Sequence, residues 1–136
     1  MLRRPNLRAL FFALAVAVQT IACGSNANPN SGRVLISIAV TPVTAEAQNF
    51  SGGKVTFTAT GTFSLPPSPA PVTFVAPYLG SFTIEDTSIA TIVSTGTGTL
   101  TAQCVPGVSG TTSVIAAASA NSGTVQVSAA AQLTCP

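Results

Sequence analysis

Val55-Thr-Phe-Thr-Ala-Thr-Gly-Thr-Phe63 is the stretch of sequence that decides the fold, because its chemistry repeats every two residues. Its odd-numbered positions are apolar or glycine, and its even-numbered positions are all threonine. Successive side chains of a β-strand point to opposite faces, so the stretch predicts a strand with one buried face and one threonine face. Threonine is β-branched and packs well on a pleated surface without adding charge. The chain is therefore predicted to bury a core against one side of a sheet.

Runs with the same period lie on both sides of this strand and are separated by Gly, Pro, Asn and Ser. After the amino-terminal leader, no window has a convincing helical period of 3.6 residues. Short strands divided by turn residues predict an antiparallel β-sandwich over residues 34–136. The predicted inward faces of the other runs are Val34, Ile36, Ile38 and Val40; Phe82 and Ile84; Leu100, Ala102 and Cys104; Thr112, Val114, Ala116 and Ala118; and Val125, Val127, Ala129, Ala131, Leu133 and Cys135.

Composition excludes several classes of function. The chain has 136 residues, enough for one domain, with no His or Trp and only 6% charged residues, against about 25% in a typical soluble domain. Without the first eight residues, the net charge of the chain is close to zero, which excludes binding to the phosphates of nucleic acids. The lack of His removes most acid–base and metal chemistry, so we expect no enzyme activity, no metal and no cofactor. The charged residues are Arg3, Arg4 and Arg8, then Arg33, Lys54, Glu46, Glu85 and Asp86.

The amino terminus has the pattern of an export signal. A basic start precedes an unbroken apolar run of ten residues, Ala9 to Val18. Ten to fourteen apolar helical residues reach only about 15–21 Å, short of the roughly 30 Å hydrocarbon core of a bilayer. The run therefore predicts the apolar region of a signal peptide and not a spanning helix.

Thr20-Ile-Ala-Cys23, at the end of this leader, resembles the bacterial lipobox, although Thr20 departs from the usual leucine. The resemblance implies a lipoprotein signal peptide over 1–22, cleavage after Ala22, and a Cys23 that carries diacylglyceryl and palmitate. Two or more acyl chains anchor a protein stably, whereas one does not. Gly24 in place of Asp favours the outer membrane by the enteric sorting rule. The alternative is ordinary signal cleavage, for example after Ala15-Val-Ala17, which leaves Cys23 free.

Residues 23–33 are predicted to be the lipidated cysteine and a flexible tether, because Gly24 to Gly32 is small, polar and aperiodic. Residues 34–136 are predicted to be the folded domain.

The predicted domain contains four motifs: Ile36-Ser-Ile-Ala-Val-Thr-Pro42, Asp86-Thr-Ser-Ile-Ala-Thr-Ile92, Ser94-Thr-Gly-Thr-Gly-Thr-Leu-Thr-Ala102 and Gly110-Thr-Thr-Ser-Val-Ile-Ala116. Together they resemble bacterial immunoglobulin-like domains of group 2, the kind found in invasin- and intimin-type surface proteins. Phe82 stands where the family usually has a core Trp, and a Pro-rich insertion and two cysteines are further departures. The resemblance implies an all-β, immunoglobulin-like antiparallel β-sandwich of about seven strands.

Cys104 and Cys135 remain as an even pair in an oxidising compartment, and both have inward parity on their runs. If Ala118 and Val125 flank the last turn, Val108 lies opposite Cys135, and a folded-back loop would bring Cys104 within reach. We therefore expect a disulfide. The alternative is a redox or metal pair, which no CxxC spacing or histidine supports.

Three further places are candidates for function. Glu85 and Asp86 are adjacent and point to opposite faces of a strand, so we expect a solvated turn, with calcium as the alternative. Ser64-Leu-Pro-Pro-Ser-Pro-Ala-Pro71 is polyproline-like and is either a stiff connection or a recognition loop. Tyr78 and Leu79 form either a packed corner or a small contact patch.

These observations predict a non-enzymatic, lipid-anchored protein of the bacterial cell envelope, exported and held at the outer membrane. A single domain would act as a structural or protein-interaction module, with other envelope proteins as partners. The alternative is an adhesin or glycan-binding module that uses Tyr78 and the Pro-rich loop. An enzyme is the third hypothesis, and the fold alone decides among none of them.

Overall fold

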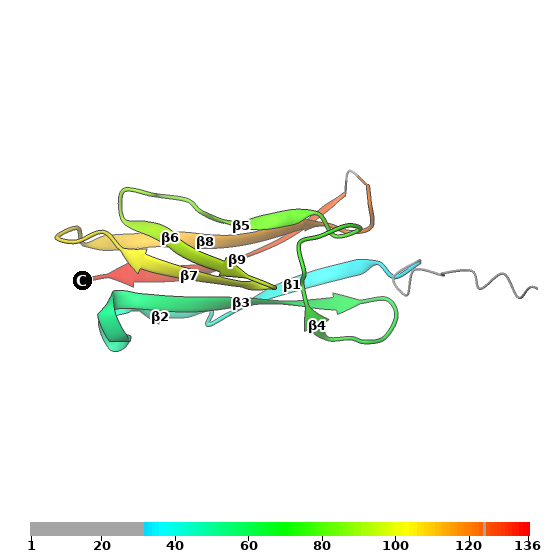
Figure 1. Ribbon diagram of the computed structural model, residues 1–136, viewed down its shortest axis with the longest axis horizontal. Coiled ribbons are helices and arrows are strands. Elements are labelled where there is room, and N and C mark those ends of the chain that lie inside the picture. Colours follow the sequence, from blue (N-terminus) through cyan, green and yellow to red (C-terminus); the bar gives the residue numbers. More distant parts are fainter. Residues whose placement is uncertain (1–31, 124) are drawn as a thin grey trace, which may run out of the picture.

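The computed structural model describes residues 32–123 and 125–136, which fold into two packed β-sheets (Figure 1). The leader, Cys23 and the residues before Gly32 lie outside the described part of the chain. Within that part, nine strands and two short 3-10 helices are present. In chain order they are β1 (Leu35–Thr41), β2 (Thr44–Glu46), η1 (Ala47–Asn49), η2 (Ser51–Gly53), β3 (Lys54–Phe63), β4 (Ala70–Pro71), β5 (Gly80–Ile84), β6 (Ala90–Gly96), β7 (Thr99–Cys104), β8 (Gly110–Ser119) and β9 (Gln126–Cys135).

The strand order is that of an immunoglobulin-like sandwich. One sheet has the order β1-β3-β7-β6, with β4 added beside β3, and the other has the order β2-β9-β8-β5. Immunoglobulin domains place their first, second, fifth and fourth strands in one sheet and their third, sixth and seventh in the other. With β2 and β4 set aside, the seven remaining strands follow this order. The predicted fold class is confirmed.

The two strands beyond the predicted seven are short. The chain leaves β1 at Pro42, which has no N–H to continue the ladder, and crosses to the other sheet as β2. There β2 pairs with β9 in parallel, with Ala45 opposite Leu133. The sandwich is therefore antiparallel except for this one pair. The other short strand, β4, pairs with Thr60 and Gly61 of β3.

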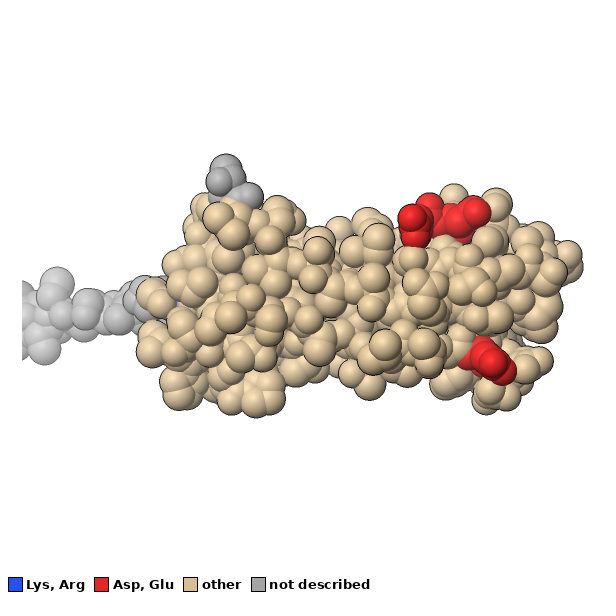
Figure 2. All heavy atoms as spheres, turned by 180° about the vertical axis from the view of Figure 1, so that it is seen from behind, with Lys and Arg blue, Asp and Glu red and all other residues tan. Residues whose placement is uncertain are grey.

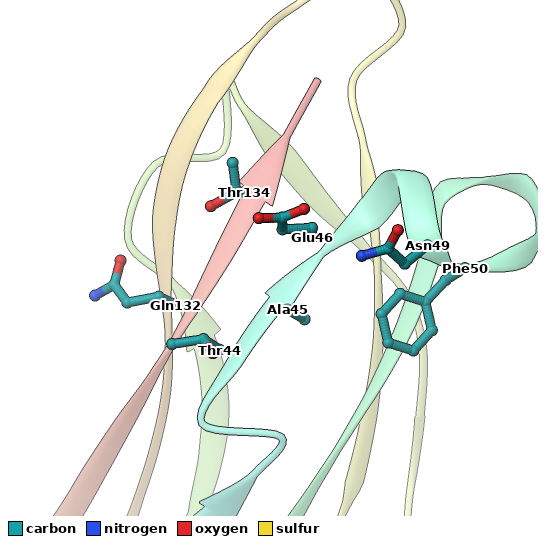
Figure 3. A pocket seen from close by; sticks show the side chains of 7 residues that line it. All are labelled: Thr44, Ala45, Glu46, Asn49, Phe50, Gln132 and Thr134. Atoms are coloured by element: carbon teal, nitrogen blue, oxygen red, sulfur yellow. The ribbon is translucent and has the colours of Figure 1, made fainter.

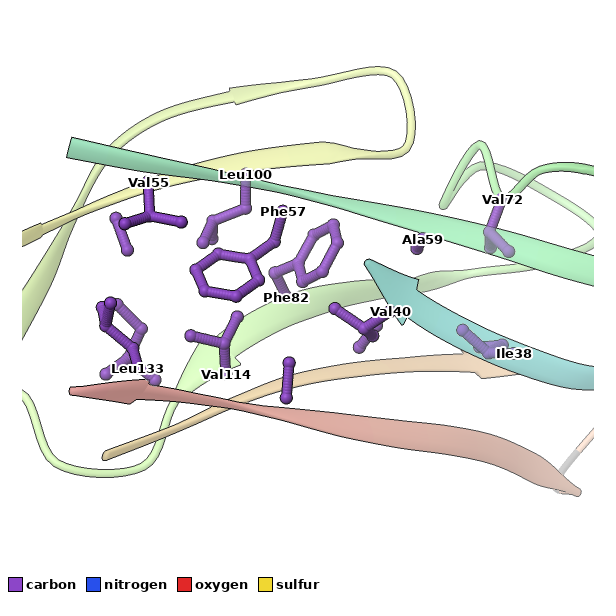
Figure 4. Close-up of a cluster of buried hydrophobic side chains, with 14 of the residues drawn as sticks. Ile38, Val40, Val55, Phe57, Ala59, Val72, Phe82, Leu100, Val114 and Leu133 are labelled. Carbon is purple, nitrogen blue, oxygen red and sulfur yellow. The ribbon is translucent and has the colours of Figure 1, made fainter. Parts of the chain in front are cut away.

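Alternation along β3 builds the core as predicted. Val55, Phe57 and Ala59 are fully buried between the sheets, and Figure 4 shows the Phe57 ring among the side chains of β5, β7 and β8. On the outer face of the same sheet, the hydroxyls of Thr56 and Thr101 lie 2.9 Å apart across neighbouring strands. This pair forms a cross-strand hydrogen bond on the threonine face.

The prediction for the first strand is wrong at Ile36, which is exposed, whereas Leu35 is buried. The cause is a bulge: Leu35 pairs with Phe63 but Ser37 pairs with Thr62, so Ile36 has no partner and the parity changes there. The bulge also explains Gly61 on the inward face of β3. A Cβ on Gly61 would lie 2.6 Å from the Leu35 Cδ1 atom, so the glycine makes room for the leucine.

The register of the last hairpin differs from the prediction by two residues. Ala118 pairs with Val127 and not with Val125, so Gly110 lies opposite Cys135. The reason is a later turn, since β8 continues to Ser119 and the chain reverses around Asn121-Ser-Gly123. Val125 consequently lies before the strand and is exposed. The predicted inward parity of the other residues of β9 holds.

Candidate functional site

The predicted contact patch of Tyr78 and Leu79 is divided by the fold. The Tyr78 side chain is buried, its hydroxyl donates to the Arg33 carbonyl oxygen at 2.9 Å, and its ring meets the Phe63 ring edge-on at 5.1 Å. Leu79, by contrast, is exposed. The physical reason is that Tyr78 closes the end of the core, where the polar tip of a tyrosine still finds a partner. Tyr78 is therefore a packed corner and cannot offer its ring to a ligand.

The Pro-rich segment is held against the domain by Arg33, a residue that sequence reasoning placed in the tether. The Arg33 side chain is 6% exposed, and its guanidinium carbon lies 3.6 Å from the centre of the Phe63 ring. Its Nε donates to the Leu65 carbonyl oxygen at 3.0 Å, and a terminal nitrogen donates to the Pro67 carbonyl oxygen. These contacts make the segment a fixed connection from β3 into β4. No local pattern distinguishes an arginine that folds back from one that continues a linker.

Cys104 and Cys135 form a disulfide, with their Cα atoms 5.7 Å apart. The bond joins the end of β7 in one sheet to the end of β9 in the other, so it connects the two layers. The disulfide of antibody domains joins different strands, the second and the sixth. The predicted pairing is present, although the register that led to it was two residues off.

Glu85 and Asp86 follow β5, at the end of the sandwich that carries Cys135. The Asp86 carboxylate accepts hydrogen bonds from the Ser88 hydroxyl at 2.6 Å and the Ser88 N–H at 2.9 Å. These bonds favour the ionised form and lower the pKa of Asp86 below its ordinary value. In residues 32–123 and 125–136, no three His, Cys, Asp or Glu side chains are grouped to hold a metal ion. The carboxylate closes a turn.

Sequence reasoning missed an open groove of about 520 Å³ beside β2. It is lined by the Glu46 carboxylate of β2, by the Asn49 amide of η1 and by Phe50, the residue after η1, which is 40% exposed. Gln132 and Thr134 complete it from β9, as Figure 3 shows. These residues lie more than 80 positions apart in the chain, roughly the length of a small domain. Only the parallel pairing of β2 with β9 brings them together.

The side chains of this groove can bind a polar ligand. An exposed aromatic ring offers a face for stacking, while the carboxylate accepts hydrogen bonds and the two amides both donate and accept them. Glu46 also accepts a hydrogen bond from the Gln48 side chain at 2.9 Å, which holds the carboxylate at the groove. Glu46 is the one carboxylate in the lining.

A second hollow of about 200 Å³ opens between the edges of β5 and β6. Threonine, serine and glycine line it together with the rings of Phe74 and Phe82, which meet edge-on at 5.2 Å. Its lining includes no charged side chain, so it offers little beyond hydroxyl contacts.

Comparison of the chain with protein-family models, with curated proteins and with solved structures found no match. Across the two described segments, no helix is long and apolar enough to cross a membrane.

Proposed function

We propose that this chain is a non-enzymatic lipoprotein of the bacterial cell envelope, whose single immunoglobulin-like domain is a structural or protein-interaction module. One observation carries the proposal: β1 begins at one end of the sandwich and β9 finishes at the opposite end (Figure 1). A domain held at its amino terminus therefore presents the groove beside β2 and the Asp86 turn away from the point of attachment. The resemblance to group 2 bacterial immunoglobulin-like domains and the lipobox-like Thr20-Ile-Ala-Cys23 support the same proposal.

Acylation of Cys23 is the first test. Wild type should take up radiolabelled palmitate and partition into detergent, and Cys23→Ser should abolish both. A double variant, Cys104→Ala with Cys135→Ala, is the matched control and should keep the label. If ordinary signal cleavage occurs instead, mass spectrometry finds an unmodified Cys23 and wild type takes up no palmitate.

The outer-membrane address has its own test. Gly24→Asp supplies the residue that the enteric sorting rule treats as a retention signal, so in an enteric host this variant should move to the inner-membrane fraction. An unchanged distribution of Gly24→Asp would contradict sorting by that rule.

The absence of catalysis is tested with hydrolase substrate panels. The domain should be inert, because it has no histidine and its carboxylates at Glu85 and Asp86 are not arranged as a facing pair. Turnover that disappears in Glu85→Gln or Asp86→Asn would overturn this part of the proposal.

The groove beside β2 favours a second candidate, a glycan-binding module. The candidate based on Tyr78 is replaced, because that ring is buried. Phe50 would stack on a sugar ring while Glu46 and Asn49 bind hydroxyl groups. Since the one charged residue of the lining is negative, neutral or amino sugars fit better than acidic ones.

Glycan arrays followed by calorimetry test this candidate. Phe50→Ala should weaken binding by about tenfold, the usual worth of a stacking contact, and Glu46→Gln should also weaken it. Val93→Ala, an exposed position on β6, is the control and should bind as wild type does. If no glycan binds, or if Phe50→Ala binds unchanged, the groove is not a sugar site.

A further inference from the structure

The end of the sandwich where β1 begins carries exposed apolar side chains on three loops. Leu65 lies in the loop after β3, Val75 and Leu79 lie in the segment before β5, and Val125 lies directly before β9. Their side chains are between 49% and 67% exposed. We call these four residues the apolar end.

Hydrogen bonds fix these loops to one another and to the start of β1. The Leu65 carbonyl oxygen accepts from Arg33 at 3.0 Å, and the Leu79 carbonyl oxygen accepts from the Ser119 N–H at 2.8 Å. The Val125 carbonyl oxygen accepts from the Ala120 N–H at 2.9 Å, and the Ala120 carbonyl oxygen in turn accepts from the Leu35 N–H at 2.8 Å. Backbone hydrogen bonds and the Arg33 side chain therefore hold the apolar end beside the first described residues.

The charged groups of the domain are segregated from this end. Glu46, Glu85, Asp86 and Lys54 lie at or near the end that carries Cys135. Figure 2 shows the acidic side chains of one face gathered there. Arg33 is at the apolar end, but its side chain is buried under the Pro-rich segment. The four residues of the apolar end are thus separated along the long axis from the exposed charges, although Val43 and Phe50 are also exposed near the charged end.

The chain outside the described part enters at the apolar end. Gly32 lies nine residues after Cys23, and nine residues span at most about 32 Å even when fully extended. An acyl group on Cys23 would therefore keep the apolar end close to the bilayer. We propose that the apolar end docks on the membrane and inserts its apolar side chains into the boundary between headgroups and acyl chains.

This inference rests on the proposed lipid anchor and goes beyond it. An anchor alone needs only a tether, whereas here the domain itself binds the bilayer and stands upright on it. Among the described residues, no charged side chain is exposed at this end, and exposed apolar patches of soluble proteins mark interaction sites. The groove beside β2 and the Asp86 turn then face away from the membrane.

Tryptophan fluorescence tests the docking directly, because the chain has no tryptophan of its own. The mature acylated chain with Leu79→Trp is reconstituted into phosphatidylcholine vesicles, with and without brominated acyl chains. Its emission should shift to the blue, and bromine should quench it several-fold more strongly than the emission of Val93→Trp. Val93 is a matched control, since it is exposed on the edge strand β6. Equal quenching of the two variants would overturn the inference.

Separate readouts distinguish failure of the docking from failure of the anchor. The mass of each preparation reports acylation of Cys23 independently of fluorescence, so an acylated chain without quenching at Leu79→Trp refutes only the docking. The same tryptophan variants in a Cys23→Ser background are added to vesicles at high lipid concentration. Preferential quenching at Leu79→Trp supports the docking even if acylation fails, and its absence counts against the docking. Leu65→Ser in the Cys23→Ser, Leu79→Trp background should lower vesicle partitioning about tenfold, whereas Val93→Ser should not.

Discussion

Reduction of the Cys104–Cys135 disulfide should lower the melting temperature of the domain by a large amount. The bond connects the two sheets at the end where β7 and β9 finish, and β8 and β9 lie within the loop that it closes. Breaking it gives the unfolded chain freedom that the cross-link had removed. Much of the core is alanine, which buries little apolar area and therefore contributes less to stability than leucine or phenylalanine.

The magnitude follows from the sequence separation of 31 residues. In the chain-entropy model a loop of this length is worth roughly 12 cal/mol/K, or about 3.7 kcal/mol at 25 °C. A domain of this size has a total stability of about 5–15 kcal/mol, so the bond supplies a large share of it. At roughly 4–8 °C per kcal/mol, the melting temperature should fall by about 15–30 °C.

Thermal melting followed by circular dichroism measures this effect on the mature chain with Cys23→Ser. Reduced and oxidised samples are compared, and mass spectrometry verifies that the oxidised form is lighter by two hydrogen atoms. Cys104→Ala with Cys135→Ala is the control, and it should melt near the reduced protein with or without reductant. An unchanged melting temperature on reduction refutes the loop-entropy reasoning, and two free thiols after oxidative export refute the bond itself.

Three further changes test other parts of the fold by the same melting assay. Gly80→Ala should lower stability by about 1–3 kcal/mol, because a Cβ there would clash with a backbone carbonyl oxygen of β8. A melting temperature equal to that of wild type would contradict this close approach. Arg33→Met keeps an apolar stem against Phe63 but loses the hydrogen bonds of the guanidinium, which should lower the free energy of unfolding by about 1–3 kcal/mol. Arg33→Lys should not restore these hydrogen bonds, and wild-type stability in the lysine variant would refute the role of the planar group. Hydrogen bonds from Ser88 lower the pKa of Asp86. The ionised Asp86 carboxylate therefore stabilises the fold above the ordinary carboxyl pKa of about 4, and this stabilisation is lost as the pH falls through the lowered pKa. Asp86→Asn should remove this part of the acid sensitivity, and parallel stability–pH profiles of wild type and variant would argue against the role of Asp86.

Alternation predicts the fold wherever one face of a strand is buried. Val55 and Phe57 lie inward because β3 packs between two neighbours over a continuous core. Alternation fails at Ile36, because a β-bulge arises from pairing with the partner strand and cannot be recognised in the sequence of the bulged strand. Alternation also does not locate the turn after Ser119, because a hairpin with several candidate turn residues has more than one compatible register.

The candidate site was less predictable because its residues meet through long-range pairing. In the sequence, Glu46 and Phe50 lie in a polar stretch with no recognisable motif. They line a groove only because β2 crosses to the second sheet and lies beside Gln132. Tyr78 was a candidate contact residue because it is the single tyrosine of the chain, but its buried ring closes the end of the core. The cysteine pair was predictable, since Cys104 and Cys135 share inward parity on their strands.

The threonine outer face of β3 and β7 has a consequence for how densely such a domain can be packed. The described residues carry two cationic and three anionic side chains, so copies standing side by side meet with very little Coulomb repulsion. Their hydration depends on hydroxyl groups, and added salt changes it little because there are few charges for counter-ions to screen. A layer of these domains would therefore keep its spacing as ionic strength rises or falls, with lateral density set by steric size alone.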